Sequence, residues 1–285
     1  MSSVRSDYRC YFCTARAYER LLAKENASFE KKQLFVEKMN ATFLEMKQNF
    51  HAPHYSRVLR NHYQNLFGEK DLYLSEKQIS NNVALDLYPS LKEMAFSSEN
   101  SFQTALKLAL AGNVIDFGVH AEYDLEKTIN HVLHTPLAID NSSELYERLQ
   151  KATTILYLGD NSGEIVLDKI LIETIMHPNL FFAVRGAPVL NDVTIEDAKY
   201  VKIDDVANVI SNGYDSPSTE LEHVSSEFLD IYHKTDVIIS KGQGNLEGLY
   251  GNGNKKIFFL LMVKCDVVAE TIGVKKGDFV VLKNI

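Results

Sequence analysis

Residues 154–175, TILYLGDNSGEIVLDKILIETI, join a short apolar run to an amphipathic run through a polar corner. The first run is rich in β-branched and aromatic side chains, which is typical of a buried strand. The second run has apolar residues at helical intervals. Gly159 and Gly163 bracket the corner between the two runs. The stretch therefore predicts a strand that turns into a helix, with Asp160 and Asn161 at the turn.

Further short apolar runs follow this strand, and helix-like segments lie between them. The strand-like runs are LFFAVRG (180–186), ANVIS (207–211), DVIISKG (236–242) and KIFFLLMV (256–263). Residues 194–201 and 219–234 have helical spacing, and Thr219 with Glu222 has the T-x-x-E spacing of a capping box. Alternating strands and helices predict βαβ units in a mostly parallel α/β sheet, whose strands are apolar throughout because both faces are covered.

The chain before about residue 150 has a different rhythm. Residues 28–50, 101–112, 123–134 and 141–152 have the apolar spacing of helices, and no segment of this half predicts a strand. We therefore expect a helical domain over residues 1–150 and an α/β domain over residues 151–285. The alternative is that the helical half wraps the sheet as one compact unit.

The charge and composition exclude several classes of protein. A formal net charge of −8 argues against non-specific nucleic-acid binding, although a local basic pocket could still hold a small anionic substrate. The longest apolar run, IFFLLMV (257–263), is far shorter than the roughly 20 residues that span a membrane. The first ten residues lack the apolar segment of a secretory signal. We expect a cytoplasmic protein that binds neither nucleic acid nor membranes; its oligomeric state stays open.

The three cysteines leave two interpretations open. Cys10 and Cys13 form a Cys-x-x-Cys pair, and Cys265 lies far downstream. A structural zinc site usually has four ligands, and the sequence holds no second such pair. The thiols are either idle or part of a shared redox or metal site.

Two histidine pairs have the spacing of neighbours on a helix face. They are His51 with His54 and His131 with His134. No nearby Cys or His in the sequence completes a metal shell around either pair, so we expect packed or surface imidazoles.

Four predicted strand ends carry polar side chains. They are Asp160–Asn161, Arg185 leading to Asn191–Asp192, Ser211–Gly213, and Lys241–Asn245. The carboxyl ends of parallel strands meet at one edge of a sheet, so these corners should meet. The patterns of a P-loop, a dinucleotide fingerprint and a nucleophile elbow are all absent from these corners.

The residues at this edge favour a metal and phosphate site. Asp160, Asn161 and Asp192 offer hard oxygen ligands, which suit Mg²⁺ or Mn²⁺. Gly163 opens a helix whose first N–H groups favour an anion, and Lys241 adds a positive charge for a phosphate. Each residue taken singly also fits a cap, a turn or a solvated side chain. Their coincidence at one sheet edge favours a site.

Several motifs together resemble the DUF89 family of metal-dependent damage-control phosphatases. The motifs are Cys10-x-x-Cys13, LALAGNVIDFG (108–118), LGDNSGEIVLDKILIE (158–173), RGAPVLNDVTIEDA (185–198), KGQGNLE (241–247) and LMVKCDVVAE (261–270). The resemblance implies a helical N-terminal part packed on a Rossmann-like, three-layer α/β/α domain. It implies a divalent cation (Mg²⁺, Mn²⁺, or possible replacements Co²⁺ and Ni²⁺) held by Asp160, Asn161 and Asp192.

The resemblance also implies the residues around the substrate. Lys241 would bind phosphate, with Gly242 and Gly244 letting backbone N–H groups approach it. Asn113, Asp116 and Glu164 would lie near the same site. The implied reaction is hydrolysis of phosphate monoesters of small metabolites, including sugar phosphates and damaged phosphometabolites.

The sequence leaves the nucleophile and two other functions open. Either a water molecule or Asp160 could attack phosphorus in a metal-assisted transfer of the phosphoryl group. One alternative function is an S-adenosylmethionine-dependent methyltransferase, since LYLGDNSGE loosely resembles a methyl-donor loop. Against it, the next strand ends in Arg185, which suits an anion better than ribose hydroxyls. The other alternative is a non-catalytic protein that binds metal or a phosphometabolite.

Overall fold

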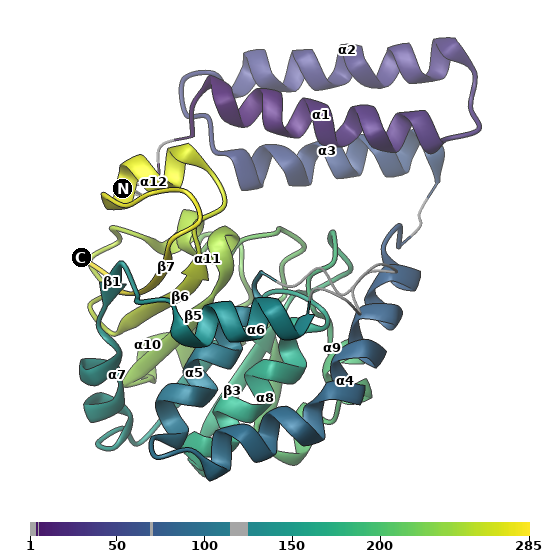
Figure 1. Ribbon diagram of the computed structural model, residues 1–285. Coiled ribbons are helices and arrows are strands. Elements are labelled where there is room, and N and C mark those ends of the chain that lie inside the picture. The colour runs from purple at the N-terminus through teal and green to yellow at the C-terminus, as the bar shows by residue number, and fades with distance from the viewer. Residues whose placement is uncertain (1–3, 5, 69–70, 115–124) are drawn as a thin grey trace.

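The computed structural model describes residues 4, 6–68, 71–114 and 125–285. Its strands form one sheet with helices on both faces, and a layer made of α1, α2 and α3 lies to one side of it (Figure 1). The helices are α1 (Tyr8–Lys24), α2 (Phe29–Met46), α3 (Ala52–Phe67), α4 (Leu74–Ser97), α5 (Ser101–Gly112), α6 (Leu125–His134), α7 (Ser142–Leu149), α8 (Glu164–Ile175), α9 (Ile195–Tyr200), α10 (Ser226–Lys234), α11 (Gly242–Leu249) and α12 (Asp266–Ile272). The strands are β1 (Ile139–Asp140), β2 (Ile155–Leu158), β3 (Leu180–Val184), β4 (Asn208–Ser211), β5 (Val237–Lys241), β6 (Ile257–Met262) and β7 (Phe279–Lys283).

The sheet has the strand order β1-β7-β6-β5-β2-β3-β4. Strands β2 to β6 are parallel, β7 runs antiparallel to β6, and β1 pairs parallel to β7. The chain moves outward from β2 through β3 to β4 and then returns to the other side of β2 to form β5. Ligands of open α/β sheets bind at such a switch of direction. The carboxyl ends of β2 and β5 are therefore where a site is expected, and the mostly parallel α/β fold is confirmed.

The alternation of β2 explains its unbroken apolar run. Ile155 and Tyr157 lie in the core on one face of the sheet, which also contains residues of α5 and α8. Leu156 and Leu158 lie in the core on the other face, with residues of α10 and α11. Successive side chains of a strand point to opposite faces, so a strand covered on both sides must be apolar at every position. Helix α8 is likewise buried from Glu164 to Ile172, because α4 and α5 cover its outer side.

The layer of α1, α2 and α3 has a small core of its own. Its buried members are Tyr18, Phe35, Met39, Tyr55, Leu59 and Tyr63. Ion pairs tie this layer to the α/β part: Arg9 of α1 meets Glu270 of α12, and Arg57 of α3 meets Asp215. The layer is thus an apolar unit whose junction with the α/β part includes charged contacts.

Helices α4 to α6 lie before residue 150 yet pack against the sheet, and their apolar residues share its core. The domain division at residue 150 stays a prediction. The sequence does not predict β1 and β7: β1 has two residues, and β7 pairs antiparallel, outside the βαβ alternation. The capping box expected at Thr219 is wrong, since α10 begins at Ser226 and Ser225 caps it. Within the described ranges, no helix is both long and apolar enough to cross a membrane.

Candidate active site

A short backbone bridge joins the segments that follow β2 and β3. Asn161 and Asp192 form an isolated antiparallel pair. The N–H of Val193 donates to the carbonyl of Asp160 at 2.9 Å, and the N–H of Ser162 donates to that of Asn191 at 2.9 Å. Two corners 30 residues apart in sequence are therefore held together by backbone hydrogen bonds. The predicted convergence of Asp160, Asn161 and Asp192 is present in the structure.

Two amides connect the carboxylates of Asp160 and Glu164. Nδ2 of Asn113 donates to Oδ2 of Asp160 at 3.2 Å and to both carboxylate oxygens of Glu164 at 3.2 and 3.3 Å. Nδ2 of Asn161 donates to Oδ2 of Asp160 at 2.7 Å and to Oε2 of Glu164 at 3.1 Å. Asn113 comes from the end of α5, so the helical half contributes to this cluster as predicted.

Asp192 is held by the buried Arg185, which was predicted at the same sheet edge but not as a partner of Asp192. Nε of Arg185 donates to Oδ2 of Asp192 at 2.6 Å, and Nη1 donates to Oδ1 of Asn245 at 2.9 Å. Nη2 of Arg185 lies 4.0 Å from Oδ1 of Asp160 and has no hydrogen-bond partner among the described residues. The sequence signal for Arg185 is its position directly after the buried strand β3, where a charged side chain needs a partner.

Asn245 ends another of the four predicted corners, but its role was not predicted from the sequence. Its Nδ2 donates to the carbonyl oxygens of Gly159 and Lys241, at 3.1 and 2.9 Å, so it joins the ends of β2 and β5. Its Oδ1 also accepts a hydrogen bond from Thr219 at 2.8 Å. Asn245 thus connects the switch point to the loop that precedes α10.

Lys241 lies in the cluster, fully buried at 0% exposure. Its Nζ is 2.6 Å from Oε1 of Glu164, 2.5 Å from Oδ1 of Asp168 and 2.8 Å from the carbonyl of Ala109. These acceptors match the three protons that an ammonium group can donate. The direct phosphate contact expected of Lys241 stays a prediction, because in this arrangement its protons are used inside the protein.

The two glycines after Lys241 have different surroundings. Gly242 has a φ of +77°, and a Cβ there would collide with the carboxylate of Asp160. A Cβ on Gly244 would instead collide with the carbonyl of Pro217. Both positions therefore require close backbone approach, Gly242 to the site and Gly244 to a neighbouring loop. Their predicted phosphate contacts are not tested, and Asp116 lies outside the described residues.

The site buries more acids than bases. Burial, followed by the charges of Glu164 and Asp192, raises the pKa of Asp160 to about 8. Burial also raises the pKa of Asp192, against the opposing charge of Arg185. Burial opposes the ionisation of Glu164, but the charge and hydrogen bond of Lys241 outweigh it and lower its pKa. Carboxylates crowded in this way favour a bound cation.

The donor set fits a divalent cation of the magnesium type. Asp160 and Asp192 offer carboxylate oxygens from two adjacent corners and are buried at 7% and 3% exposure. Hard cations take such oxygens and keep some positions for water or phosphate. The amide nitrogen of Asn161 now faces Asp160, and a turn of this amide would present its oxygen instead.

The thiols form no disulfide and lie outside this cluster. Cys10 and Cys13 are on α1, and Cys265 precedes α12, where it accepts a hydrogen bond from Nε2 of Gln243 at 3.4 Å. Burial raises the pKa values of Cys10 and Cys265. A raised pKa disfavours the thiolate form that metal binding and redox chemistry need.

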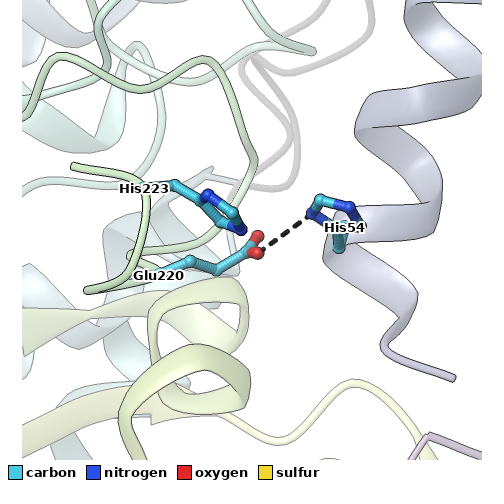
Figure 2. A group of neighbouring side chains, drawn as sticks. All are labelled: His54, Glu220 and His223. Atoms are coloured by element: carbon cyan, nitrogen blue, oxygen red, sulfur yellow. Dashed lines mark ion pairs between the residues drawn. The ribbon is translucent and has the colours of Figure 1, made fainter. Parts of the chain in front are cut away.

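A second group of ligand-type side chains appears elsewhere. The sequence shows no ligand-type neighbour of the first histidine pair, but in the structure Glu220 and His223 lie beside His54 (Figure 2). His54 is more than 160 positions from both of these residues, so spacing along the sequence could not reveal the group.

Comparisons with known proteins agree with the fold. Residues 6–280 match the model of the damage-control phosphatase ARMT1-like domain. The chain is 39% identical over 237 residues to the uncharacterized protein MJ0202 of Methanocaldococcus jannaschii, covering 80% of this chain and 78% of that protein. It is 39% identical over 221 residues to damage-control phosphatase PH1575 of Pyrococcus horikoshii, covering 76% of each.

Two further similarities extend this result. A damage-control phosphatase of Archaeoglobus fulgidus is 32% identical over 230 residues, covering 79% of this chain and 80% of that protein. The crystal structure of a DUF89 family protein from Pyrococcus horikoshii superposes with a TM-score of 0.90 at 32% identity, covering 98% of this chain and 99% of the other. The chain therefore belongs to the damage-control phosphatase ARMT1-like (DUF89) family.

Proposed function

We propose that this protein is a phosphatase that hydrolyses phosphate monoesters of small metabolites and uses a divalent cation held by Asp160, Asn161 and Asp192. The observation that supports the proposal is that these three residues meet at the switch point, beside the unpaired Nη2 of Arg185. Two relatives carry the name damage-control phosphatase, which supports damaged phosphometabolites as the substrate class.

Cationic side chains on this chain would bind the phosphate. Nη2 of Arg185 has the donor capacity for a phosphate oxygen, and guanidinium groups match such oxygens well. Lys264 is exposed, and its charge acts on both Asp160 and Glu164. A bound divalent cation would supply further positive charge as the phosphorus–oxygen bond breaks.

Buried residues behind the site would hold its acids in place. Lys241 fixes Glu164 and Asp168, and the amide of Asn113 spans Asp160 and Glu164. We propose that Lys241 acts mainly through Glu164, since a direct contact with phosphate would require it to exchange one of its buried acceptors. Such preorganised surroundings are what make a charged site effective.

The methyltransferase alternative gains no support from the geometry. At the end of β3, where a methyl-donor site would place an acid for the ribose hydroxyls, Arg185 is buried against Asp192. Only a measurement of turnover distinguishes the proposed enzyme from a non-catalytic protein that binds metal or a phosphometabolite.

A phosphate-release assay tests the proposal. The metal-free protein should be inactive toward p-nitrophenyl phosphate and small sugar phosphates, and Mg²⁺, Mn²⁺, Co²⁺ or Ni²⁺ should restore hydrolysis. Asp160→Ala and Asp192→Ala should each lose roughly 1,000-fold in kcat/KM, because both change the charge around the phosphoryl group. Glu196→Ala, which removes an exposed acid near Asp192 in the chain, is the control and should keep full activity. Full activity in either aspartate variant, or metal-independent turnover, would refute the proposal.

A further inference from the structure

The group formed by His54, Glu220 and His223 has the composition of a transition-metal site. His54 lies near the start of α3, and the other two lie in the loop between β4 and α10 (Figure 2). One ligand atom from each residue lies within 4.8 Å of the other two. Nδ1 of His54 is 3.3 Å from Oε2 of Glu220. Three ligand-type groups from distant parts of the chain thus point toward one position.

The carboxylate of Glu220 is held in a fixed direction. The hydroxyl of Ser216, itself 0% exposed, donates to Oε1 at 2.6 Å and leaves Oε2 facing His54. Burial alone would raise the pKa of Glu220, but the hydrogen bonds from His54 and Ser216 outweigh it and lower its pKa. The group therefore contains a carboxylate ligand oriented by a buried neighbour, an arrangement that supports metal ligands.

The imidazole of His223 is stacked and still accessible. Its ring lies 5.0 Å from that of Tyr214 and 5.4 Å from that of His54, at interplanar angles of 27° and 20°. Ligand atoms around a tetrahedral zinc ion are about 3.3 Å apart, from metal–ligand lengths of about 2.0–2.1 Å. The His54–Glu220 pair already has this spacing, and a rotation of the exposed His223 side chain would bring in the third ligand.

A fourth ligand is close to the same position. Nδ1 of His51 is 3.9 Å from Oε2 of Glu220, and His51 precedes α3 on the same side as His54. Two or three imidazoles with one carboxylate suit Zn²⁺, Co²⁺ or Ni²⁺, whereas Mg²⁺ prefers oxygen ligands alone. The group therefore differs in chemistry from the cluster at Asp160.

We propose that His54, Glu220 and His223 bind one divalent transition-metal ion, with zinc the best match, at a site separate from Asp160 and Asp192. The ion would join the layer of α1, α2 and α3 to the loop before α10. Thr219, the neighbour of Glu220, donates to Asn245, which in turn accepts from Arg185. The ion would thus stabilise the junction from which this hydrogen-bond chain runs to the active site.

Zinc binding by the purified, metal-free full-length chain tests the proposal. Zinc retained after gel filtration is counted by elemental analysis. The unchanged protein should retain one more equivalent than His223→Gln, which alters an exposed side chain. Glu220→Gln should lose the same equivalent. Saturating zinc should raise the melting temperature of the unchanged protein by about 5 °C more than that of either variant.

Two controls separate this site from others. His131→Gln/His134→Gln removes a pair with the same sequence spacing as His51 and His54, both exposed, and should retain all the zinc. Asp192→Asn should also retain the equivalent that His223→Gln loses. Far-ultraviolet circular dichroism checks that each variant is folded. Equal zinc content in folded His223→Gln and the unchanged protein would overturn the proposal, as would loss of the same equivalent in the His131/His134 variant.

Discussion

The backbone of Gly242 touches the carboxylate of Asp160 across the switch point of the sheet. A Cβ on Gly242 would lie 2.8 Å from Oδ1 of Asp160 and closer still to its Cγ and Oδ2. The residue also has a φ of +77°, which side chains disfavour. The first residue of α11, directly after β5, therefore packs against this acid.

Gly242→Ala should inactivate the enzyme by displacing Asp160. We expect kcat/KM to fall at least roughly 100-fold, because misplacing a reacting group by about 1 Å has that effect. The matched control is Gly253→Ala, at a φ of +79° and with nothing described within 4 Å of the added Cβ. Both variants should be destabilised by about 1–3 kcal/mol from backbone strain. Equal activities in a phosphate-release assay would show that the contact with Asp160 is unimportant.

The substitution Lys241→Met should destabilise the folded protein. Removing the ammonium leaves Glu164 and Asp168 buried without their cation, which should lower the free energy of unfolding by about 3–5 kcal/mol. Denaturant unfolding measures this change. The control is Lys169→Met, whose buried ammonium donates to the carbonyl of Val201 and should lose about 1 kcal/mol. Similar losses in the two variants would contradict a special role for the Lys241 cluster.

Lys264→Met should weaken substrate binding without affecting stability. Its exposed ammonium acts electrostatically on Asp160 and would attract an incoming phosphate, so we expect KM to rise about 10-fold and kcat to change less. Lys255→Met removes an equally exposed charge at the opposite end of β6 and should leave KM unchanged. An equal rise of KM in both variants would mean that the overall surface charge attracts the substrate, and that Lys264 makes no local contact with it.

Arg185→Lys should separate charge from geometry. A lysine keeps the positive charge, but its three donors share one nitrogen and cannot reproduce the planar spread by which Nε of Arg185 meets Asp192 and Nη1 meets Asn245. We expect kcat/KM to fall roughly 10- to 150-fold, the range for losing a hydrogen bond to a charged group. Arg148→Lys, in a half-exposed pair with Glu144, serves as the control. Steady-state kinetics measure this change. Unchanged kcat/KM in Arg185→Lys would show that the guanidinium geometry of Arg185 is not needed.

The fold was largely predictable because the residue pattern of the central strands shows that both faces of the sheet are covered. The run at Ile155 is apolar at every position, and this pattern requires helices on both faces. The antiparallel pairing of β7 with β6 could not be deduced, because no local pattern fixes the direction in which a strand pairs. For the same reason, the pairing of β1 with β7 could not be predicted from the sequence.

The sequence predicted the residues at the strand ends of the site, but not the contacts of the buried residues that support them. Asp160 and Asp192 follow buried strands, so sheet geometry alone brings them together. The burial of Lys241 against Asp168 depends on how α5 and α8 pack, which residue order does not reveal. Glu220 and His223 reach His54 only through the placement of the three-helix layer.

The charged junction of that layer has a consequence for solution behaviour. Arg9 with Glu270 and Arg57 with Asp215 are partly exposed pairs, whereas the cores on either side are apolar. Ionic strength screens exposed charges and leaves apolar cores intact. Concentrated salt should therefore loosen the seam between the two parts first, and proteolysis or hydrogen exchange in high salt would reveal α1, α2 and α3 parting from the sheet as one body.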